Sequence, residues 1–316
     1  MTSQVDAPTP ADGEPRRAIA EFAAAKINLT LEIDGRRADG YHALRSLVAF
    51  ARDAGDELTL TPGPELSLET TGPEAPAIEG PNLVTATAQA VRFAIPSSTT
   101  GAFLLEKHLP VASGIGGGSA DAAAAIRALA RANAIDDPAK EFAQLAVSLG
   151  ADIPVCIGGP FSIGSPVCTA AYMSGIGDKV WRPATGTLLP PEGLAALLVN
   201  PRIAVPTGAV FKALAAPALT DQRPAEPPAP FITSDDCLSY IAASRNDLEA
   251  PAVAIAPIIA EVLSALRKLP GCRLARMSGS GATCFALLDD IEAAEHAAHA
   301  LGQIQPQWWI KATRLG

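Results

Sequence analysis

Residues 110–123, PVASGIGGGSADAA, have the composition of a loop that binds an anion through its backbone. Glycine permits positive φ and lets a ligand approach the main chain. Four glycines stand within five positions here: Gly114, Gly116, Gly117 and Gly118. The alanine-rich run that follows predicts a helix, whose exposed amides and dipole favour a phosphate group at its start. A turn without a ligand needs one or two glycines, so we expect a phosphate-binding loop here.

The loop differs from two common nucleotide-binding patterns. It lacks the GK[ST] ending of a Walker A sequence, and the GxGxxG dinucleotide pattern fails at Ser119, where the third glycine should stand. Ser119 could cap the helix or turn its hydroxyl towards a phosphate or magnesium.

Two charged residues outside the loop could take part in phosphoryl transfer. Lys26 stands in an otherwise apolar run, where a lysine either extends to the solvent at an edge or is held inward by a carboxylate. Asp152 lies in the turn GADIP, where an aspartate either caps the turn or is free to accept a proton. The residues alone leave both alternatives open.

Three segments, in order along the chain, resemble the motifs of the GHMP kinase superfamily. They are AKINL at residues 25–29, the glycine loop at 110–123, and MSGSGATCF at 277–285. Three more resemble one branch of that superfamily: RADGYH at 37–42, LGADIP at 149–154 and NDLE at 246–249. The resemblance runs from Ala18 to the C-terminus. It implies an ATP-dependent kinase that phosphorylates the 2-hydroxyl of 4-diphosphocytidyl-2-C-methyl-D-erythritol, in the non-mevalonate route to isoprenoid precursors.

The resemblance also implies roles for single residues. Asp152 would be the catalytic base and would contact the substrate, with Lys26 beside it and the reacting oxygen. The residues implied to bind ATP are Asn82, Lys107, Pro110, Gly114, Ile115, Gly116, Gly117, Gly118 and Ser119. Those implied to bind the substrate are Asn28, Tyr41, His42, Asp152, Thr207, Phe211, Gly279 and Gly281. Tyr41, His42 and Phe211 would surround the cytosine.

Several of these residues have a purely structural alternative. Asn82 could be a helix N-cap, and Lys107 a solvated lysine at the end of a strand. Asn28 could make a strand-end hydrogen bond, and Tyr41 with His42 could begin a partly buried strand. Asp121 departs from the family pattern, in which many relatives carry an asparagine, so we expect it to face away from the phosphates or to help hold magnesium.

Composition limits the partners. The chain has 316 residues, of which 48% are hydrophobic and 18% charged, and its net charge is −9. Such a chain can form a large core, and its acidity argues against binding to nucleic acids. Five cysteines without CxxC spacing predict free thiols in a reducing cytoplasm. With no apolar run long enough for a membrane span, we expect a cytoplasmic enzyme, monomeric or homodimeric.

The sequence also indicates whether the protein holds a metal ion by itself. No cluster of histidines, cysteines and carboxylates has the spacing of a metal site, so the chain predicts no metal held by the protein alone. Magnesium would arrive with ATP.

The elements that must position these residues predict an α+β fold. Strands are expected at 27–33, 42–50, 57–61, 65–69 and 101–107, and helices at 82–93, 119–133, 138–149 and 252–269. The last fifty residues should form a strand, a helix and a strand, and 220–236 a surface loop.

We predict two GHMP kinase domains, at 18–165 and 166–316, after a disordered tail at 1–17 that is not a signal peptide. The active site would lie in the cleft between the domains. Two other functions stay open: a mevalonate or homoserine type of kinase, and a nucleotide-binding module without turnover.

Overall fold

The computed structural model describes residues 17–158, 169–184, 186–220 and 226–316 of the chain. The strands are β1 (Ile19–Asn28), β2 (Glu32–Arg36), β3 (His42–Gly63), β4 (Ser67–Thr71), β5 (Thr100–Glu106), β6 (Ala171–Gly175), β7 (Lys179–Trp181), β8 (Leu194–Asn200), β9 (Cys272–Met277), β10 (Cys284–Leu288) and β11 (Trp309–Leu315). The helices are the 3-10 turn η1 (Ala75–Ala77), α1 (Leu83–Ala94), α2 (Gly117–Ala132), α3 (Pro138–Glu141), α4 (Ala143–Leu149), α5 (Ile153–Ile157), α6 (Thr207–Leu214), α7 (Ser234–Ala243), α8 (Glu249–Ile255), α9 (Ile258–Arg267) and α10 (Ile291–Ile304).

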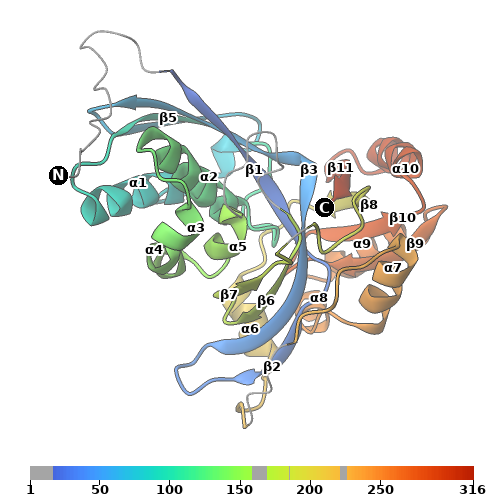
Figure 1. The fold of residues 1–316 in the computed structure, drawn as a ribbon. Coiled ribbons are helices and arrows are strands. Elements are labelled where there is room, and N and C mark those ends of the chain that lie inside the picture. The colour runs from blue at the N-terminus through green and yellow to red at the C-terminus, as the bar shows by residue number, and fades with distance from the viewer. Residues whose placement is uncertain (1–16, 159–168, 185, 221–225) are drawn as a thin grey trace.

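Strand β3 is the axis of the molecule (Figure 1). The described strands form one sheet with the order β4-β5-β3-β11-β8-β10-β9, and β1, β2 and β6 also pair with β3. β1 runs antiparallel to β3 with a register shift between Ala24 and Lys26. β11 meets β3 where Leu315 pairs with Ala51, and this contact joins the N-terminal strands to the C-terminal ones.

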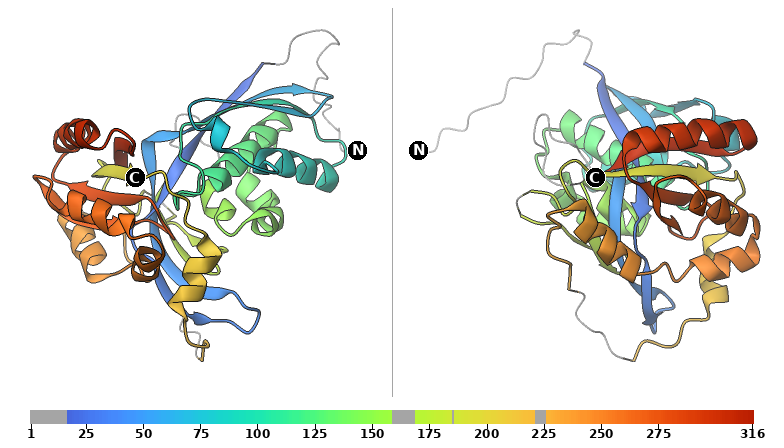
Figure 2. Two further views of the ribbon diagram at one scale, coloured as in Figure 1. Left: turned by 180° about the vertical axis from the view of Figure 1, so that it is seen from behind. Right: turned by 90° about the vertical axis from the view of Figure 1, so that its right-hand side faces the viewer.

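The helices lie in two groups on either side of this axis. Figure 2 shows the green helices of the N-terminal half gathered beside β1, β3 and β5, and the orange and red helices beside the C-terminal strands. In the first group α2 is buried from Ala120 to Ala130. Because alanine has the highest helix propensity and a small side chain, this helix can pack closely against the sheet along its length.

The structure confirms the α+β class and corrects several element boundaries. β3 is one strand of 22 residues where two were expected. Within residues 51–56, Ala51 pairs with β11, and Gly55 and Asp56 pair with β1. The strand expected at 27–33 is interrupted after Asn28, and β2 begins at Glu32.

Two predicted helices are each divided in two. The helix expected at 138–149 breaks at Phe142, which ends α3 and begins α4. The helix expected at 252–269 breaks before Pro257, where a proline can start a helix but cannot continue one. Residues 221–225 of the loop expected at 220–236 lie outside the described residues, and α7 begins at Ser234, inside the expected loop.

Some predictions fall outside the described residues or are only partly covered. The expected domain boundary at 165/166 lies within residues 159–168, and the tail lies almost wholly within residues 1–16, both outside the described part of the chain. Among the described cysteines, Cys237, Cys272 and Cys284 are free thiols, as expected. In the described part of the chain, no helix has the length and apolar character needed to cross a membrane.

Candidate active site

Lys26 and Asp152 meet although 126 residues separate them in the chain. Lys26 lies near the end of β1, and Asp152 is the residue before α5. Lys26 Nζ donates to Asp152 Oδ1 over 3.0 Å. The lysine side chain is only 4% exposed while that of Asp152 is 39% exposed, so the carboxylate remains accessible to a substrate. Lys26 could extend to the solvent or be held inward by a carboxylate, and the structure favours the second interpretation.

Asn28 lies on the same face of β1 as Lys26 and extends the pair into a chain of polar contacts. Lys26 Nζ donates to Asn28 Oδ1 over 3.0 Å, and Asn28 Nδ2 donates to Ser46 Oγ over 2.8 Å. Asn28 is buried, and these bonds fix the orientation of its amide. The strand-end hydrogen bond of the alternative interpretation is therefore present, and direct contact with the substrate stays a prediction.

The glycine loop lies directly against this pair. The Lys26 N–H donates to the carbonyl of Ile115 over 2.9 Å, and a Cβ placed on Gly116 would lie 3.2 Å from Lys26 Cε. Gly116 has φ +66° and is the N-cap of α2. Ser119 is therefore not the cap, and its hydroxyl lies in the first turn of a helix whose N-terminus adjoins the Lys26–Asp152 pair.

A second glycine turn, residues 277–283, holds the loop from the C-terminal side. Ser278 Oγ accepts from the Asn28 N–H over 3.1 Å and donates to the Gly114 carbonyl over 3.2 Å. A Cβ on Gly114 would lie 2.5 Å from the Gly281 oxygen, and one on Gly279 would lie 2.6 Å from the Gly114 oxygen. The two backbones are thus in direct contact, which only glycine allows. Whether Gly279 and Gly281 also contact a substrate stays a prediction.

Lys107 is buried beneath the glycine loop rather than solvated. Its ammonium group pairs with Asp56 and, over 2.7 Å, with Asp121 Oδ2. Asp56 Oδ1 also accepts from the amides of His108 and Leu109. The solvated alternative is wrong, and the predicted contact of Lys107 with ATP stays a prediction.

Asp121 faces Lys107 and is 3% exposed, so it is directed into the protein. Its second oxygen, Oδ1, is buried without a hydrogen-bond partner. Burial raises the pKa of this carboxyl to about 7, although the Lys107 ammonium acts in the opposite direction. For Lys107, burial lowers the pKa but the carboxylates of Asp121 and Asp56 outweigh it, so the net shift is upward. One ammonium group thus faces two carboxylates, and a proton on Asp121 removes the excess negative charge.

Asp121→Asn should therefore change how stability depends on pH. A carboxyl whose folded pKa is raised stabilises the fold at low pH and loses that contribution as pH rises through about 7. We expect the wild type to lose about 1–3 kcal/mol relative to Asp121→Asn between pH 5 and 8. Urea unfolding of both proteins at several pH values measures the difference. Parallel pH curves would show that Asp121 does not titrate in this range.

Asn82 and Pro110 lie at the edges of the predicted nucleotide site. Asn82 Oδ1 accepts from the Val84 N–H over 2.8 Å, so Asn82 is the N-cap of α1. Pro110 is buried, and its carbonyl accepts from Ser113 Oγ over 2.6 Å. Contact of either residue with ATP stays a prediction.

The residues predicted to surround the cytosine are partly brought together. The His42 and Phe211 rings stack with centroids 4.8 Å apart, and Thr207 Oγ1 lies 2.9 Å from Ser280 Oγ of the second glycine turn. Burial, followed by the charge of Arg36, lowers the pKa of His42 and so favours the neutral imidazole that hydrogen bonding to a base edge needs. Tyr41, the residue before His42, is 60% exposed.

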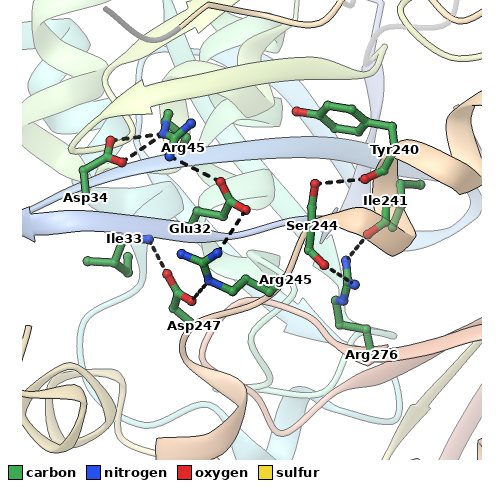
Figure 3. A network of polar contacts seen from close by, with 10 residues as sticks. All are labelled: Glu32, Ile33, Asp34, Arg45, Tyr240, Ile241, Ser244, Arg245, Asp247 and Arg276. Carbon is green, nitrogen blue, oxygen red and sulfur yellow. Dashed lines mark hydrogen bonds and ion pairs between the residues drawn. The ribbon is translucent and has the colours of Figure 1, made fainter. Parts of the chain in front are cut away.

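A polar network ties the hairpin that carries Tyr41 and His42 to the C-terminal half (Figure 3). Asp247 accepts from the Ile33 N–H over 2.7 Å and pairs with Arg245, whose guanidinium reaches Glu32. Arg276 donates to the carbonyls of Ile241 and Ser244. The NDLE segment has a structural part in this region. Asn246 Nδ2 donates to the Met277 and Gly279 carbonyls and so anchors the second glycine turn.

Asp56, Ser278 and Arg127 were missed as residues of the site or its support. Ser278 lay inside a recognised motif, but its bonds to Asn28 and Gly114 cross 250 and 164 residues. The available signal for Arg127 was an arginine among the alanines of a helix, because an arginine that is buried there needs a partner for its charge.

Comparison with known proteins assigns the class first. The family model "GHMP kinases N terminal domain" matches residues 82–160, and the model "GHMP kinases C terminal" matches residues 236–306. A homoserine kinase from Cytophaga hutchinsonii superposes with a TM-score of 0.65 at 15% identity over 98% of both chains, which is a likeness of fold. The N-terminal and C-terminal halves of the chain thus each match a GHMP kinase domain, and the fold is that of a GHMP kinase.

Closer relatives narrow this class. A 4-diphosphocytidyl-2-C-methyl-D-erythritol kinase of Rhodopseudomonas palustris is 47% identical over 95% of this chain and 99% of its own length. One from Methylorubrum extorquens is 50% identical over 93% of this chain and 97% of its own length. A crystal structure of 4-(cytidine 5'-diphospho)-2C-methyl-D-erythritol kinase, at 30% identity, matches with a TM-score of 0.69 over 94% of this chain and 99% of its own. The chain belongs to the 4-diphosphocytidyl-2-C-methyl-D-erythritol kinase family.

Proposed function

We propose that the protein transfers the γ-phosphoryl group of ATP to the 2-hydroxyl of 4-diphosphocytidyl-2-C-methyl-D-erythritol, in the non-mevalonate route to isoprenoid precursors. The Lys26–Asp152 pair, at 3.0 Å and in contact with the glycine loop, carries this proposal. Family membership supports the choice of substrate, because the relatives bear the name of that kinase.

The residues divide the work of phosphoryl transfer. The substrate hydroxyl oxygen attacks the γ-phosphorus, the bond from that phosphorus to the bridging oxygen of ADP breaks, and the hydroxyl proton passes to the Asp152 carboxylate. Lys26 holds this carboxylate on one side and offers positive charge where the oxygen becomes negative. The amides at the start of α2 receive the phosphates.

Magnesium would accompany ATP. This ion prefers oxygen ligands and is commonly bound by one or two carboxylates together with phosphate oxygens, whose charge it neutralises. In the Walker A phosphate loop, a serine or threonine hydroxyl binds it. Ser119, partly buried in the first turn of α2, offers such an oxygen. Asp121 is bonded to Lys107 and 3% exposed, so we propose Ser119 as the protein ligand.

The test is ADP release with magnesium present and with three alcohols side by side: the cytidine substrate, mevalonate and homoserine. We expect turnover with the cytidine substrate alone, and phosphorus NMR of the product should place the new phosphate on the 2-hydroxyl. Activity on mevalonate or homoserine but not on the cytidine substrate would contradict the proposal. ATP binding without ADP release would instead identify a nucleotide-binding module.

The oligomeric state is a separate question. Sedimentation of the same sample decides between monomer and homodimer.

A further inference from the structure

Arg127 is a buried cation that the proposed reaction does not use. It lies within α2, the helix whose N-terminus forms the predicted phosphate site, and it is 1% exposed. A buried guanidinium is costly unless hydrogen bonds satisfy its donors. Its partners therefore show which parts of the fold it holds.

The guanidinium of Arg127 joins two elements that carry the Lys26–Asp152 pair. On β1, Nε donates to Glu21 Oε2 over 2.7 Å and Nη2 donates to the Phe22 carbonyl over 2.8 Å. On α5, Nη1 donates to the Cys156 carbonyl over 2.9 Å. β1 continues to Lys26, so one planar group bonds the strand of the lysine to the helix that follows the aspartate.

Helix α5 is short enough to transmit this contact to Asp152. The Cys156 N–H donates to the Asp152 carbonyl over 3.3 Å, so one helical turn separates the end that Arg127 holds from the aspartate. Arg182 Nη2 also donates to the Val155 carbonyl, over 2.7 Å. A displacement of this end of α5 would therefore move the Asp152 carboxylate relative to Lys26.

We propose that Arg127 is a positioning residue, which bonds β1 to α5 and thereby sets the Asp152 carboxylate against Lys26 and the reacting hydroxyl. The proposal rests on the function proposed above. The fork of the guanidinium is essential to it, because a lysine could keep the ion pair with Glu21 but could not also reach both carbonyls. Arg131 Nη1, 3.1 Å from Glu21 Oε1, supplies a second positive charge to the same carboxylate from the surface.

Arg127→Lys tests the geometry while keeping the charge. Because a misplacement of about 1 Å at a reacting group can cost about 100-fold in rate, we expect kcat to fall about 10- to 100-fold. The KM values for ATP and for the cytidine substrate should change less than about threefold, because the substitution leaves in place the glycine loop and every predicted substrate contact other than Asp152. Affinity for a non-hydrolysable ATP analogue, measured by calorimetry, should likewise be unchanged.

Leu129→Ala is the matched control. Leu129 is fully buried in the same helix, so its truncation destabilises the fold without removing a bond between β1 and α5. Both variants are assayed at a temperature at which circular dichroism shows them fully folded. We expect Leu129→Ala to keep kcat within about threefold of the wild type.

Two further measurements keep the proposal falsifiable. If Arg127→Lys does not fold, Arg127→Met combined with Glu21→Gln removes both charges, so that no unpaired buried charge remains. Wild-type kcat in the folded Arg127→Lys protein, or in the double variant, would overturn the proposal.

If the wild type turns over none of the alcohols, the proposed function fails. Hydrogen exchange at the amides of residues 153 and 155–157 then tests the positioning separately. We expect faster exchange in Arg127→Lys, and unchanged exchange would contradict the positioning role.

Discussion

Asp152→Asn is expected to lower kcat by a factor of about 10²–10⁴, the usual contribution of a positioned general base. Asparagine has nearly the same shape and keeps an oxygen that can accept from Lys26 Nζ, but it cannot take the hydroxyl proton. The KM for ATP should stay within about threefold, because the glycine loop is unchanged. Steady-state kinetics and thermal unfolding of the same preparations measure both effects.

The control for this prediction is Asp136→Asn. Asp136 is an exposed residue of the same half of the molecule, so the substitution makes the same change of charge outside the site. We expect wild-type kinetics. A folded Asp152→Asn protein with near-normal turnover would show that Asp152 is not the base.

Lys26 and Asp152 should also act as a unit. Lys26→Ala alone should lower kcat by orders of magnitude, and the double variant should lose little more than the worse single variant, because each residue works through their contact at 3.0 Å. Losses that multiply in the double variant would indicate independent roles.

Gly114→Ala is expected to destabilise the fold by about 2–4 kcal/mol, the sum of a left-handed alanine and a tightly packed methyl group. Gly114 has φ +76°, and its Cβ would lie 2.5 Å from the Gly281 oxygen and 2.8 Å from the Ser278 oxygen. Both atoms belong to the backbone, so the two glycine turns must separate. We therefore also expect the KM for ATP to rise at least about tenfold, because such a shift misplaces the loop.

Gly302→Ala is the opposite control. Gly302 lies in α10, has no positive φ, and a Cβ there would meet nothing within 4 Å. Alanine should stabilise this helix by about 0.5–1 kcal/mol. Urea unfolding of the two variants should therefore give shifts of opposite sign. Equal stability of Gly114→Ala and the wild type would mean that the two turns do not touch in solution.

The sequence predicted the structure best where neighbouring residues alone determine it. Clustered glycines followed by an alanine-rich run predicted both the loop and α2, because backbone freedom and helix propensity are properties of neighbouring residues. The same reasoning failed in α8 and α9, where the apolar pattern outweighed Pro257. It also divided β3 in two at residues 51–56, where Ala51, Gly55 and Asp56 pair with strands that are distant in the sequence.

The contacts that build the site lay beyond local reasoning. Family resemblance placed Lys26 beside Asp152, because no pattern of spacing connects residues so far apart. The burial of Lys107 between two carboxylates, and the bonds of Arg127, depend on which elements pack together. The sequence shows polar residues within apolar segments, but it does not show which residues they contact.

The pairing of β11 with β3 also has a consequence for the order in which the molecule is made. Ala51 pairs with Leu315, and Phe50 exchanges backbone hydrogen bonds with Gly316. A ribosome adding about 5–20 residues per second makes the second partner roughly 15–50 s after the first. During that interval this part of β3 has an open edge, and exposed strand edges invite pairing with other chains. Until the last residues are made, this edge of β3 is therefore a place where the nascent chain can pair with another chain.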